Sequence, residues 1–289
     1  MTTQRLDQAL VSRQLVRSRT KAKRLIQDSA VAVDGVVQTS PAHTVQPEAS
    51  IVLLQTDDDV GRGAVKLRAA FDTWDIPVSG LNAADVGAST GGFTQVLLER
   101  GASHVVALDV GHGQLDATLS SDPRVTVAEG VSAVDLSAEW WAEQGFPPCS
   151  LVVADLSFIS LTKVMEPLIQ TFGSDAHFVL LVKPQFEVGR SGLDGGIVKD
   201  RARQRAALDA VVAHCVDKGL PVRAVRYSPV TGEKGNVEYL VYASATASHH
   251  PAEWDGTITA DPSEGCDMAR NMLVVAHPGE TTPSRLLTP

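Results

Sequence analysis

The sequence has few cysteines, and their spacing is not that of a metal site or a disulfide framework. Its three cysteines, Cys149, Cys215 and Cys266, lie far apart and form no Cys-x-x-Cys pair. This spacing favours a reducing cytoplasm as the location of the protein. No cluster of metal-ligating residue types stands out elsewhere, so we expect no bound metal.

Long apolar runs are also missing. A helix that spans a bilayer needs roughly 18 apolar residues or more, whereas the longest runs here, such as residues 178–182, have the length of a strand. The first 25 residues are basic and contain no apolar segment of the kind found in a secretory signal. We therefore expect no stable association with a membrane.

What is present is an ordinary globular composition with an uneven charge. The 289 residues are 44% hydrophobic and 20% charged, which excludes a wholly disordered or fibrous chain and fits about two domains. Residues 1–24 carry a net charge of +6, although the whole chain carries −9, so that the remaining residues carry −15. A basic segment on an acidic body predicts a local surface for a polyanion.

The N-terminal region has the pattern of a small α+β module over residues 1–56. Ser18 is placed to cap the second of two helices, and Asp34-Gly35 has the residue types of a type I′ hairpin turn. The acidic residues 57–63 have the composition of a linker. We expect helices over residues 5–15 and 19–27, and strands at residues 31–33, 36–37 and 51–54.

From residue 64 to residue 245 the pattern alternates between strand and helix, which predicts a parallel sheet covered on both faces. A short, turn-rich connection makes the last two strands antiparallel. Residues 246–289 are rich in Ser, Thr, Pro and His, and we expect a mostly disordered tail in which only residues 272–276 pack. The expected strands lie near 82–86, 104–109, 125–128, 150–154, 177–182, 222–228 and 237–243, and the helices at 92–100, 112–119, 137–144, 161–171 and 199–218.

A glycine-bearing turn joins the first of these strands to a helix, in the segment Asn82–Phe93. Gly87 allows a tight turn after the strand, and Gly91 and Gly92 allow the backbone to approach a ligand at the helix N-terminus. Asp109 ends the next strand, where its carboxylate can accept from both hydroxyls of a ribose. A turn that holds no ligand is the alternative, but the pairing with Asp109 in a βαβ unit favours a nucleotide-like cofactor.

The spacing of the turn also bears on which cofactor it holds. A dinucleotide site would have the pattern GxGxxG, whereas this turn has GxxxGG. Asp85 stands two residues before the first glycine, where a carboxylate suits a cationic ligand better than a pyrophosphate. This favours S-adenosylmethionine over NAD.

Four charged residues lie at strand ends or beside glycine: Lys66, Asp155, Lys183 and Glu238. Asp155 and Lys183 directly follow apolar strands, so in a parallel sheet both lie at the carboxyl edge, where ligands bind. Each residue taken singly would more often be a solvated surface group. As a set, they are candidates for catalysis.

In order and context this quartet resembles the K-D-K-E set of FtsJ-like ribose 2′-O-methyltransferases. Residues 1–245 resemble the TlyA (haemolysin A) subfamily, on the phrases DVGASTGGFT, LDVGHGQL, ADLSFISL, KPQFEVG and GIVKD. The resemblance implies an S4-type RNA-binding domain followed by a seven-stranded Rossmann-like class I methyltransferase sheet, with the last strand antiparallel. It also implies methyl transfer from S-adenosylmethionine to a cytidine 2′-hydroxyl of ribosomal RNA, with ribosomal RNA or ribosomal subunits as partners. The cofactor-binding residues that it implies are Asp85, Gly87, Ser89, Gly91, Gly92, Asp109 and Glu129.

Methylating a ribose hydroxyl requires in-line positioning and the removal of one proton. A lysine amine can accept that proton when burial and a nearby cation lower its pKa. We expect Lys183 to be this base and Lys66 to be the nearby cation, with Asp155 and Glu238 orienting the two amines. The basic residues expected to contact RNA phosphates are Arg5, Arg17, Arg19, Lys21 and Lys23.

Three other functions stay open at this point. A non-catalytic RNA-binding protein could keep this fold as a scaffold, although the complete quartet argues against that. A pore-forming cytolysin is disfavoured by the missing membrane span, and an NAD-dependent oxidoreductase by the missing GxGxxG. The target nucleotide, the ribosomal subunit and the oligomeric state cannot be read from the sequence.

Overall fold

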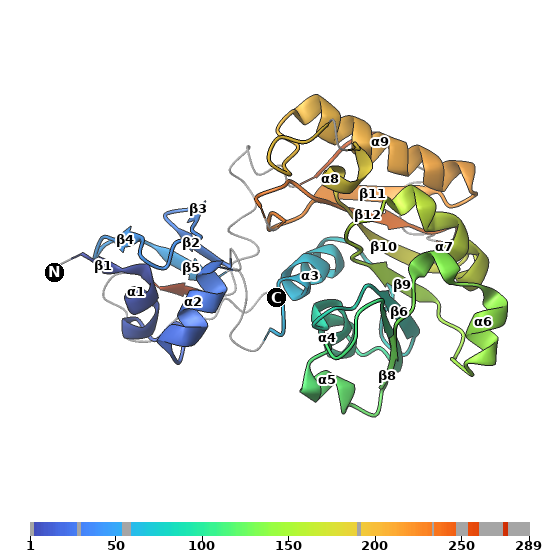
Figure 1. Cartoon of the computed structure of the whole chain (residues 1–289), viewed down its shortest axis with the longest axis horizontal. Helices are drawn as coiled ribbons and strands as arrows, with labels where there is room; N and C mark the ends of the chain where they lie inside the picture. The colour runs from blue at the N-terminus through green and yellow to red at the C-terminus, as the bar shows by residue number, and fades with distance from the viewer. Residues whose placement is uncertain are drawn as a thin grey trace.

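The computed structural model of the chain shows a small N-terminal unit beside a larger α/β unit (Figure 1). We call the described residues 3–53 the head and residues 59–246 the body. The structure describes residues 3–27, 30–53, 59–189, 192–232, 234–246, 254–259 and 274–276, the last of these by their backbone.

The head contains two helices packed on a small sheet, as the sequence pattern predicts. Ser18 Oγ accepts from the backbone N–H of Lys21 at 3.3 Å and so caps α2. Asp34 and Gly35 both have positive φ, 48° and 80°, which confirms the expected hairpin turn. The elements are β1 (Gln4–Arg5), α1 (Leu6–Ser12), α2 (Arg19–Gln27), β2 (Val31–Val33), β3 (Val36–Val37), β4 (Thr44–Val45) and β5 (Ile51–Leu53).

The body is built on a seven-stranded sheet with the order β11-β12-β10-β9-β6-β7-β8. Within this sheet, β12 pairs antiparallel with both β10 and β11, while the other pairings are parallel, so the predicted fold class is confirmed. The strands are β6 (Asn82–Val86), β7 (His104–Asp109), β8 (Val125–Glu129), β9 (Leu151–Ala154), β10 (His177–Val182), β11 (Val222–Tyr227) and β12 (Tyr239–Ala243).

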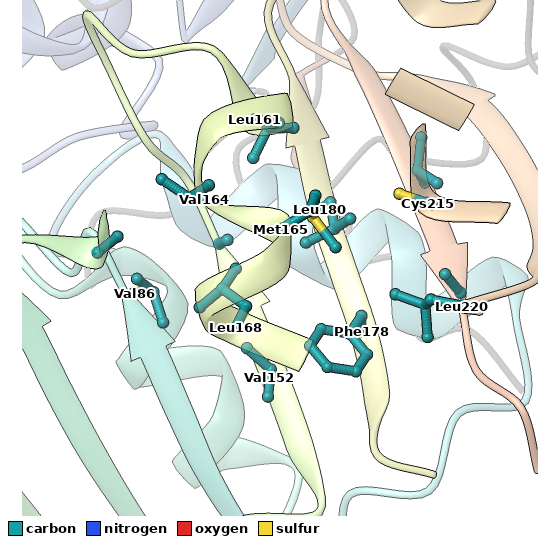
Figure 2. Close-up of a cluster of buried hydrophobic side chains, with 14 of the residues drawn as sticks. Val86, Val152, Leu161, Val164, Met165, Leu168, Phe178, Leu180, Cys215 and Leu220 are labelled. Carbon is teal, nitrogen blue, oxygen red and sulfur yellow. The ribbon is translucent and has the colours of Figure 1, made fainter. Parts of the chain in front are cut away.

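Helices cover both faces of this sheet, because successive side chains of each strand point to opposite faces. On one face Val152, Phe178 and Leu180 pack with Met165 and Leu168 of α7, as Figure 2 shows. Alternate residues of the same strands pack on the other face against α3 and α4. The helices are α3 (Gly63–Thr73), α4 (Gly92–Glu99), α5 (Ala117–Ser120), α6 (Ala138–Glu143), α7 (Met165–Phe172), α8 (Pro184–Glu187) and α9 (Arg201–Asp217), with short 3₁₀ turns at Ala133–Asp135 and Leu161–Lys163.

Several expected helix bounds are wrong, for local reasons. The helix expected over 112–119 is reduced to α5, because Gly113 has a φ of +65° and residues 110–114 form a loop. The helix expected over 161–171 is split into a 3₁₀ turn and α7. Pro167 has no N–H to donate to a carbonyl four residues back, so it is tolerated only in the first turn of a new helix. The first helix ends at Ser12, since Gln14 has a φ of +57°.

The expected tail is more ordered than predicted in one segment. Residues 254–259 lie along β11: Tyr227 N–H donates to the Thr259 carbonyl at 3.0 Å, and Trp254 N–H donates to the Val222 carbonyl at 2.9 Å. Trp254 also stacks against the guanidinium of Arg205, 5.3 Å from the ring centre. Farther on, β13 (Val274–Ala276) pairs antiparallel with β5 of the head. The rest of the tail lies outside the described residues.

Residues 59–63 of the expected linker lie against the body. The carboxylate of Asp59 is fully buried and accepts two hydrogen bonds from Arg68 of α3, at 2.6 and 3.1 Å. Val60 N–H donates to the side chain of Gln95 at 3.0 Å, and Gly63 already begins α3. The first two residues of the expected linker, 57 and 58, lie outside the described residues.

Candidate active site

A cavity of about 540 Å³ opens at the carboxyl edge of the sheet. This is the edge where strands β6, β9 and β10 end, and where ligands bind in open α/β sheets. Its walls come from the glycine turn, the start of α3, the residues after β9 and β10, and the loop that precedes β12. Arg24 of the head also lines the cavity.

The four charged residues singled out in the sequence meet in this cavity. Lys66 Nζ lies 2.7 Å from Glu238 Oε2 and 3.9 Å from Asp155 Oδ2. Lys183 Nζ lies 2.6 Å from Asp155 Oδ1 and donates to Ser157 Oγ at 2.8 Å. The two lysines and two carboxylates therefore form one connected chain, from Glu238 through Lys66 and Asp155 to Lys183.

The strand topology explains how residues so far apart in sequence come together. Asp155 and Lys183 each follow a parallel strand, and Lys66 lies in the first turns of α3. Because β12 is antiparallel, its first residue, Tyr239, pairs with Val182, the last residue of β10. This reversal brings Glu238, the residue before β12, to the edge where the parallel strands end.

Burial and mutual attraction together determine the pKa values of Lys66 and Asp155. Burial by itself lowers the pKa of Lys66, but the attraction of Asp155 and Glu238 outweighs it, and the pKa is raised. Burial likewise raises the pKa of Asp155, but the attraction of Lys66 and Lys183 is stronger and the pKa is lowered. Lys66 therefore stays a cation and Asp155 an anion at neutral pH.

Asp109 and Glu129 organise a loop at the ends of β7 and β8. Asp109 accepts from the backbone N–H of Ser89 at 2.8 Å and from that of Gly111 at 2.7 Å. Glu129 Oε1 accepts from Gly113 N–H at 2.6 Å. The two carboxylates thus connect the glycine turn to residues 111–113 and leave further lone pairs available to a ligand. Neither residue lines the cavity itself.

Asp85 lies beneath the cavity instead of in its wall. It is fully buried, and its Oδ2 accepts from Thr94 Oγ1 at 2.6 Å, while Oδ1 is buried without a hydrogen-bond partner. Burial, and secondarily the negative charges of Asp155 and Asp109, raises the pKa of Asp85 to about 7. A buried carboxylate oxygen without a partner is costly. A cation bound above it would relieve that cost.

The glycines of the turn are required by close contacts. Gly87 has a φ of +88°, and an added Cβ would lie 2.8 Å from the carbonyl oxygen of Asp155. At Gly92 an added Cβ would lie 2.8 Å from the backbone N of Ala64, where α3 and α4 start side by side. Gly91 also has a positive φ, and Ser89 takes up a φ of +48°.

Two phenylalanines that line the cavity were not among the residues predicted from the sequence. Phe158 is 90% exposed with a φ of +66°, and its ring lies 5.2 Å from that of Phe186. Lys183 Nζ lies 5.9 Å from the Phe186 ring centre. Ser157 and Gln185 were missed as well; Gln185 Nε2 donates to Glu238 Oε1 at 3.4 Å. All four follow predicted strand ends, which is the signal that could have identified them.

The basic residues predicted to contact RNA are on the head, and some of them form ion pairs there. Arg5 and Arg19 bind the buried carboxylate of Asp7 at 3.0 and 2.9 Å. The hydrogen bond from Arg5, with help from Arg19, lowers the pKa of Asp7 to about 2. Arg5, Arg17, Arg19 and Lys23 are exposed, and Lys21 is half-buried.

The comparison with known families agrees with this geometry. The FtsJ-like methyltransferase family matches residues 60–245, and the S4 domain family matches residues 4–51. The chain belongs to the FtsJ-like methyltransferase family. The head of this FtsJ-like protein is an S4 domain, and its body is the methyltransferase domain.

Individual relatives cover most of the chain. The 16S/23S rRNA (cytidine-2′-O)-methyltransferase TlyA of Mycobacterium tuberculosis is 44% identical over 242 residues, which is 82% of this chain and 88% of the relative. Hemolysin A of Brachyspira hyodysenteriae is 38% identical over 82% of this chain and 98% of its own. A solved structure from Streptococcus thermophilus, described as a candidate hemolysin, is 31% identical with a TM-score of 0.64, over 91% of this chain and 93% of the other.

The name hemolysin raises the question of a membrane-spanning element. Within the described ranges, no helix has the length and the apolar character needed to cross a bilayer.

Proposed function

We propose that this FtsJ-like protein transfers a methyl group from S-adenosylmethionine to the 2′-hydroxyl of a cytidine in ribosomal RNA. The observation that carries the proposal is the connected chain of Lys66, Glu238, Asp155 and Lys183 at the edge where the glycine turn lies. The matching family and the activity named for the M. tuberculosis relative support it. Because the proposed substrate is ribosomal RNA, we also propose a cytoplasmic location.

The residues around the glycine turn fit the cofactor. Asp109 is placed to accept from ribose hydroxyls, and Gly87 and Gly92 leave room where a side chain would clash. The unpartnered oxygen of Asp85 suits the positive charge of the cofactor. Ser89, Gly91 and Glu129 complete the set. When bound, S-adenosylmethionine supplies an electrophilic methyl group on a sulfonium sulfur.

The lysines and carboxylates supply what the acceptor hydroxyl needs. With the cofactor bound, the amine of Lys183 would serve as the base that accepts the proton of the 2′-hydroxyl. Lys66, paired with Glu238, is placed to attract the negative charge that develops on the acceptor oxygen. Asp155 then stabilises the ammonium of Lys183 through the 2.6 Å contact.

The surroundings of the cavity suit an RNA strand. Arg62 and Lys234 line it, and both carry positive charge. Such cations can neutralise phosphates next to the reacting ribose. The basic residues of the head, Arg5, Arg17, Arg19, Lys21 and Lys23, extend the positive surface for structured RNA.

Mapping 2′-O-methyl groups on ribosomal RNA tests this function. RNA from cells that lack the protein is compared with RNA from cells that regain the wild-type chain, and with purified subunits treated with the protein and the cofactor. We expect at least one methylated cytidine that depends on the protein. RNA binding without any new methyl group would instead support the non-catalytic scaffold.

We expect Phe158→Ala to reduce methylation more than RNA binding. The exposed ring of Phe158, which lines the cavity next to Phe186, offers a stacking surface for an unstacked base, and base–aromatic stacking contributes about 1–3 kcal/mol per base. Phe158→Tyr keeps the ring and is the matched control. The readout is the methylation rate at subsaturating RNA, and equal rates for the alanine and tyrosine variants would contradict a stacking role.

We expect cofactor binding to release a proton from Asp85 near neutral pH. The pKa of Asp85 is about 7 in the free protein, and a cation nearby would lower it, so binding favours the ionised carboxylate. Affinity should therefore weaken as the pH falls below about 7. Calorimetry in buffers of different ionisation enthalpy counts the protons. Asp85→Asn should remove this release, and an unchanged proton count in that variant would refute the assignment.

A further inference from the structure

A small apolar cluster joins the head to the catalytic half of the body. It contains Ala32 of β2 and Val52 of β5 from the head, with Val65 of α3 and Val230 of the loop before β12 from the body. Each of the four is at most 6% exposed. We call these four residues the interdomain cluster.

The two head residues lie on the face of the head sheet that its own core does not use. Val31 and Val33 of β2, and Ile51 and Leu53 of β5, belong to the core beneath α1 and α2. Ala32 and Val52 alternate with them, so their side chains point to the opposite face. Apolar side chains on that face add nothing to the core of the head, and they are buried by the body instead.

On the body, the cluster contacts the two elements that carry the Lys66–Glu238 pair. Val65 directly precedes Lys66 in α3. Val230 lies in the loop that leads to Glu238, and this loop is closed by a hydrogen bond from Gly232 N–H to the Asn236 carbonyl at 2.8 Å. Gly232 packs so closely on Glu238 that an added Cβ would lie 2.3 Å from Oε1. A displacement of the loop at Val230 would therefore reach the carboxylate.

A second contact ties the head to the same region. Arg24 of α2 lines the cavity and donates to the carbonyl of Val60 at 3.4 Å, three residues before α3 begins. The head therefore contacts the body near Lys66, through Val60 and Val65, and near Glu238, through Val230.

We infer that docking of the head through the interdomain cluster positions Lys66 and Glu238 for catalysis, so that the head sets the turnover rate and not only the affinity for RNA. This inference rests on the proposed methyl transfer to RNA. Ala32, Val52, Val65 and Val230 are positioning residues: they act through α3 and the loop before β12 and touch no reacting atom.

The test replaces a cluster residue from each side with a neutral polar one, as Val52→Asn and Val230→Asn. Val36→Asn is the matched control, because Val36 lies on the neighbouring strand β3 and is 62% exposed. At saturating ribosomal subunits and cofactor, we expect each cluster variant to lower kcat by roughly 10- to 100-fold with unchanged KM for RNA, since small misplacements remote from the chemistry have effects of this size. The control should keep both values.

The double variant shows whether the two substitutions lower kcat through one shared interface or through two independent defects. If both substitutions break one interface, Val52→Asn with Val230→Asn should be no slower than the slower single variant. Multiplying effects, or an unchanged kcat in the single variants, would overturn the inference.

Amide hydrogen exchange provides a second readout that does not depend on methylation activity. In the full-length protein, Val52→Asn should lower the protection of amides in α3 and at the start of β12, whereas Val36→Asn should not. Protection in the core of the head reports whether the Val52 variant is folded, and Val230→Asn tests the interface without altering the head. Unchanged protection of α3 in both cluster variants would overturn the inference. A wild-type protein that methylates no RNA would refute the proposed function and leave this exchange result to decide the docking.

Discussion

Replacing Lys183 with alanine is expected to slow methyl transfer by at least roughly 10²–10⁴-fold, the range that general-base assistance supplies. RNA and cofactor should still bind, because the side chain is assigned to proton removal. Lys183→Arg should fail as well, since a guanidinium stays protonated and cannot accept the proton. Single-turnover methylation at saturating RNA and cofactor measures the effect.

The arginine variant separates a base from a docking charge. It keeps the positive charge, so a purely electrostatic role would let it restore much of the rate. Lys163 provides the matched control, because it is exposed and does not line the cavity, and substitution there should leave the rate unchanged. A near wild-type rate for Lys183→Arg would contradict the general-base role while leaving the family assignment untouched.

Loss of the carboxylate in Asp109→Ala is expected to weaken S-adenosylmethionine binding by at least roughly 100-fold, since two hydrogen bonds to a charged group contribute about 1.5–3 kcal/mol each. The same substitution removes the acceptor for Ser89 N–H and Gly111 N–H, which loosens the turn as well. Titration calorimetry with the cofactor gives the affinity.

Two comparisons make this result specific. Asp217→Ala removes an exposed carboxylate at the end of α9 and should leave the affinity unchanged. RNA binding by the Asp109 variant should stay close to normal, because the basic surface of the head is untouched. Wild-type affinity in Asp109→Ala would exclude this residue as the partner of the ribose.

The strands of the body could be predicted within one or two residues because each is a short apolar run bounded by turn residues. The run 177–182 is the clearest case, buried on both faces of the sheet as β10. The same reasoning placed Asp155 and Lys183 at one edge, since both follow such runs. Glu238 was also singled out, at the start of the last strand, but only the antiparallel pairing of β12 with β10 brings it to the same edge.

Contacts between segments that are distant in the chain could not be predicted from the sequence. Nothing local indicates that Lys66 binds Glu238 more closely than Asp155, or that Ala32 and Val52 are buried by the body. Residues 254–259 were misjudged for the same reason: their polar composition predicts disorder, whereas hydrogen bonds to the edge of β11 hold them in place. Local composition shows no such partner.

The place of β12 in the sheet has a consequence for how the protein is synthesised. β12 is the last strand of the sheet in the chain, yet it lies between β10 and β11, which are synthesised before it. A nascent chain that ends before residue 238 can form the glycine turn and the parallel strands, but it leaves the edge of β10 open and lacks Glu238. The Lys66–Glu238 pair spans 172 residues and closes only after the whole domain has emerged from the ribosome. If the proposed mechanism holds, we expect chains that end before Glu238 to be inactive on RNA, because their set of four charged residues is incomplete.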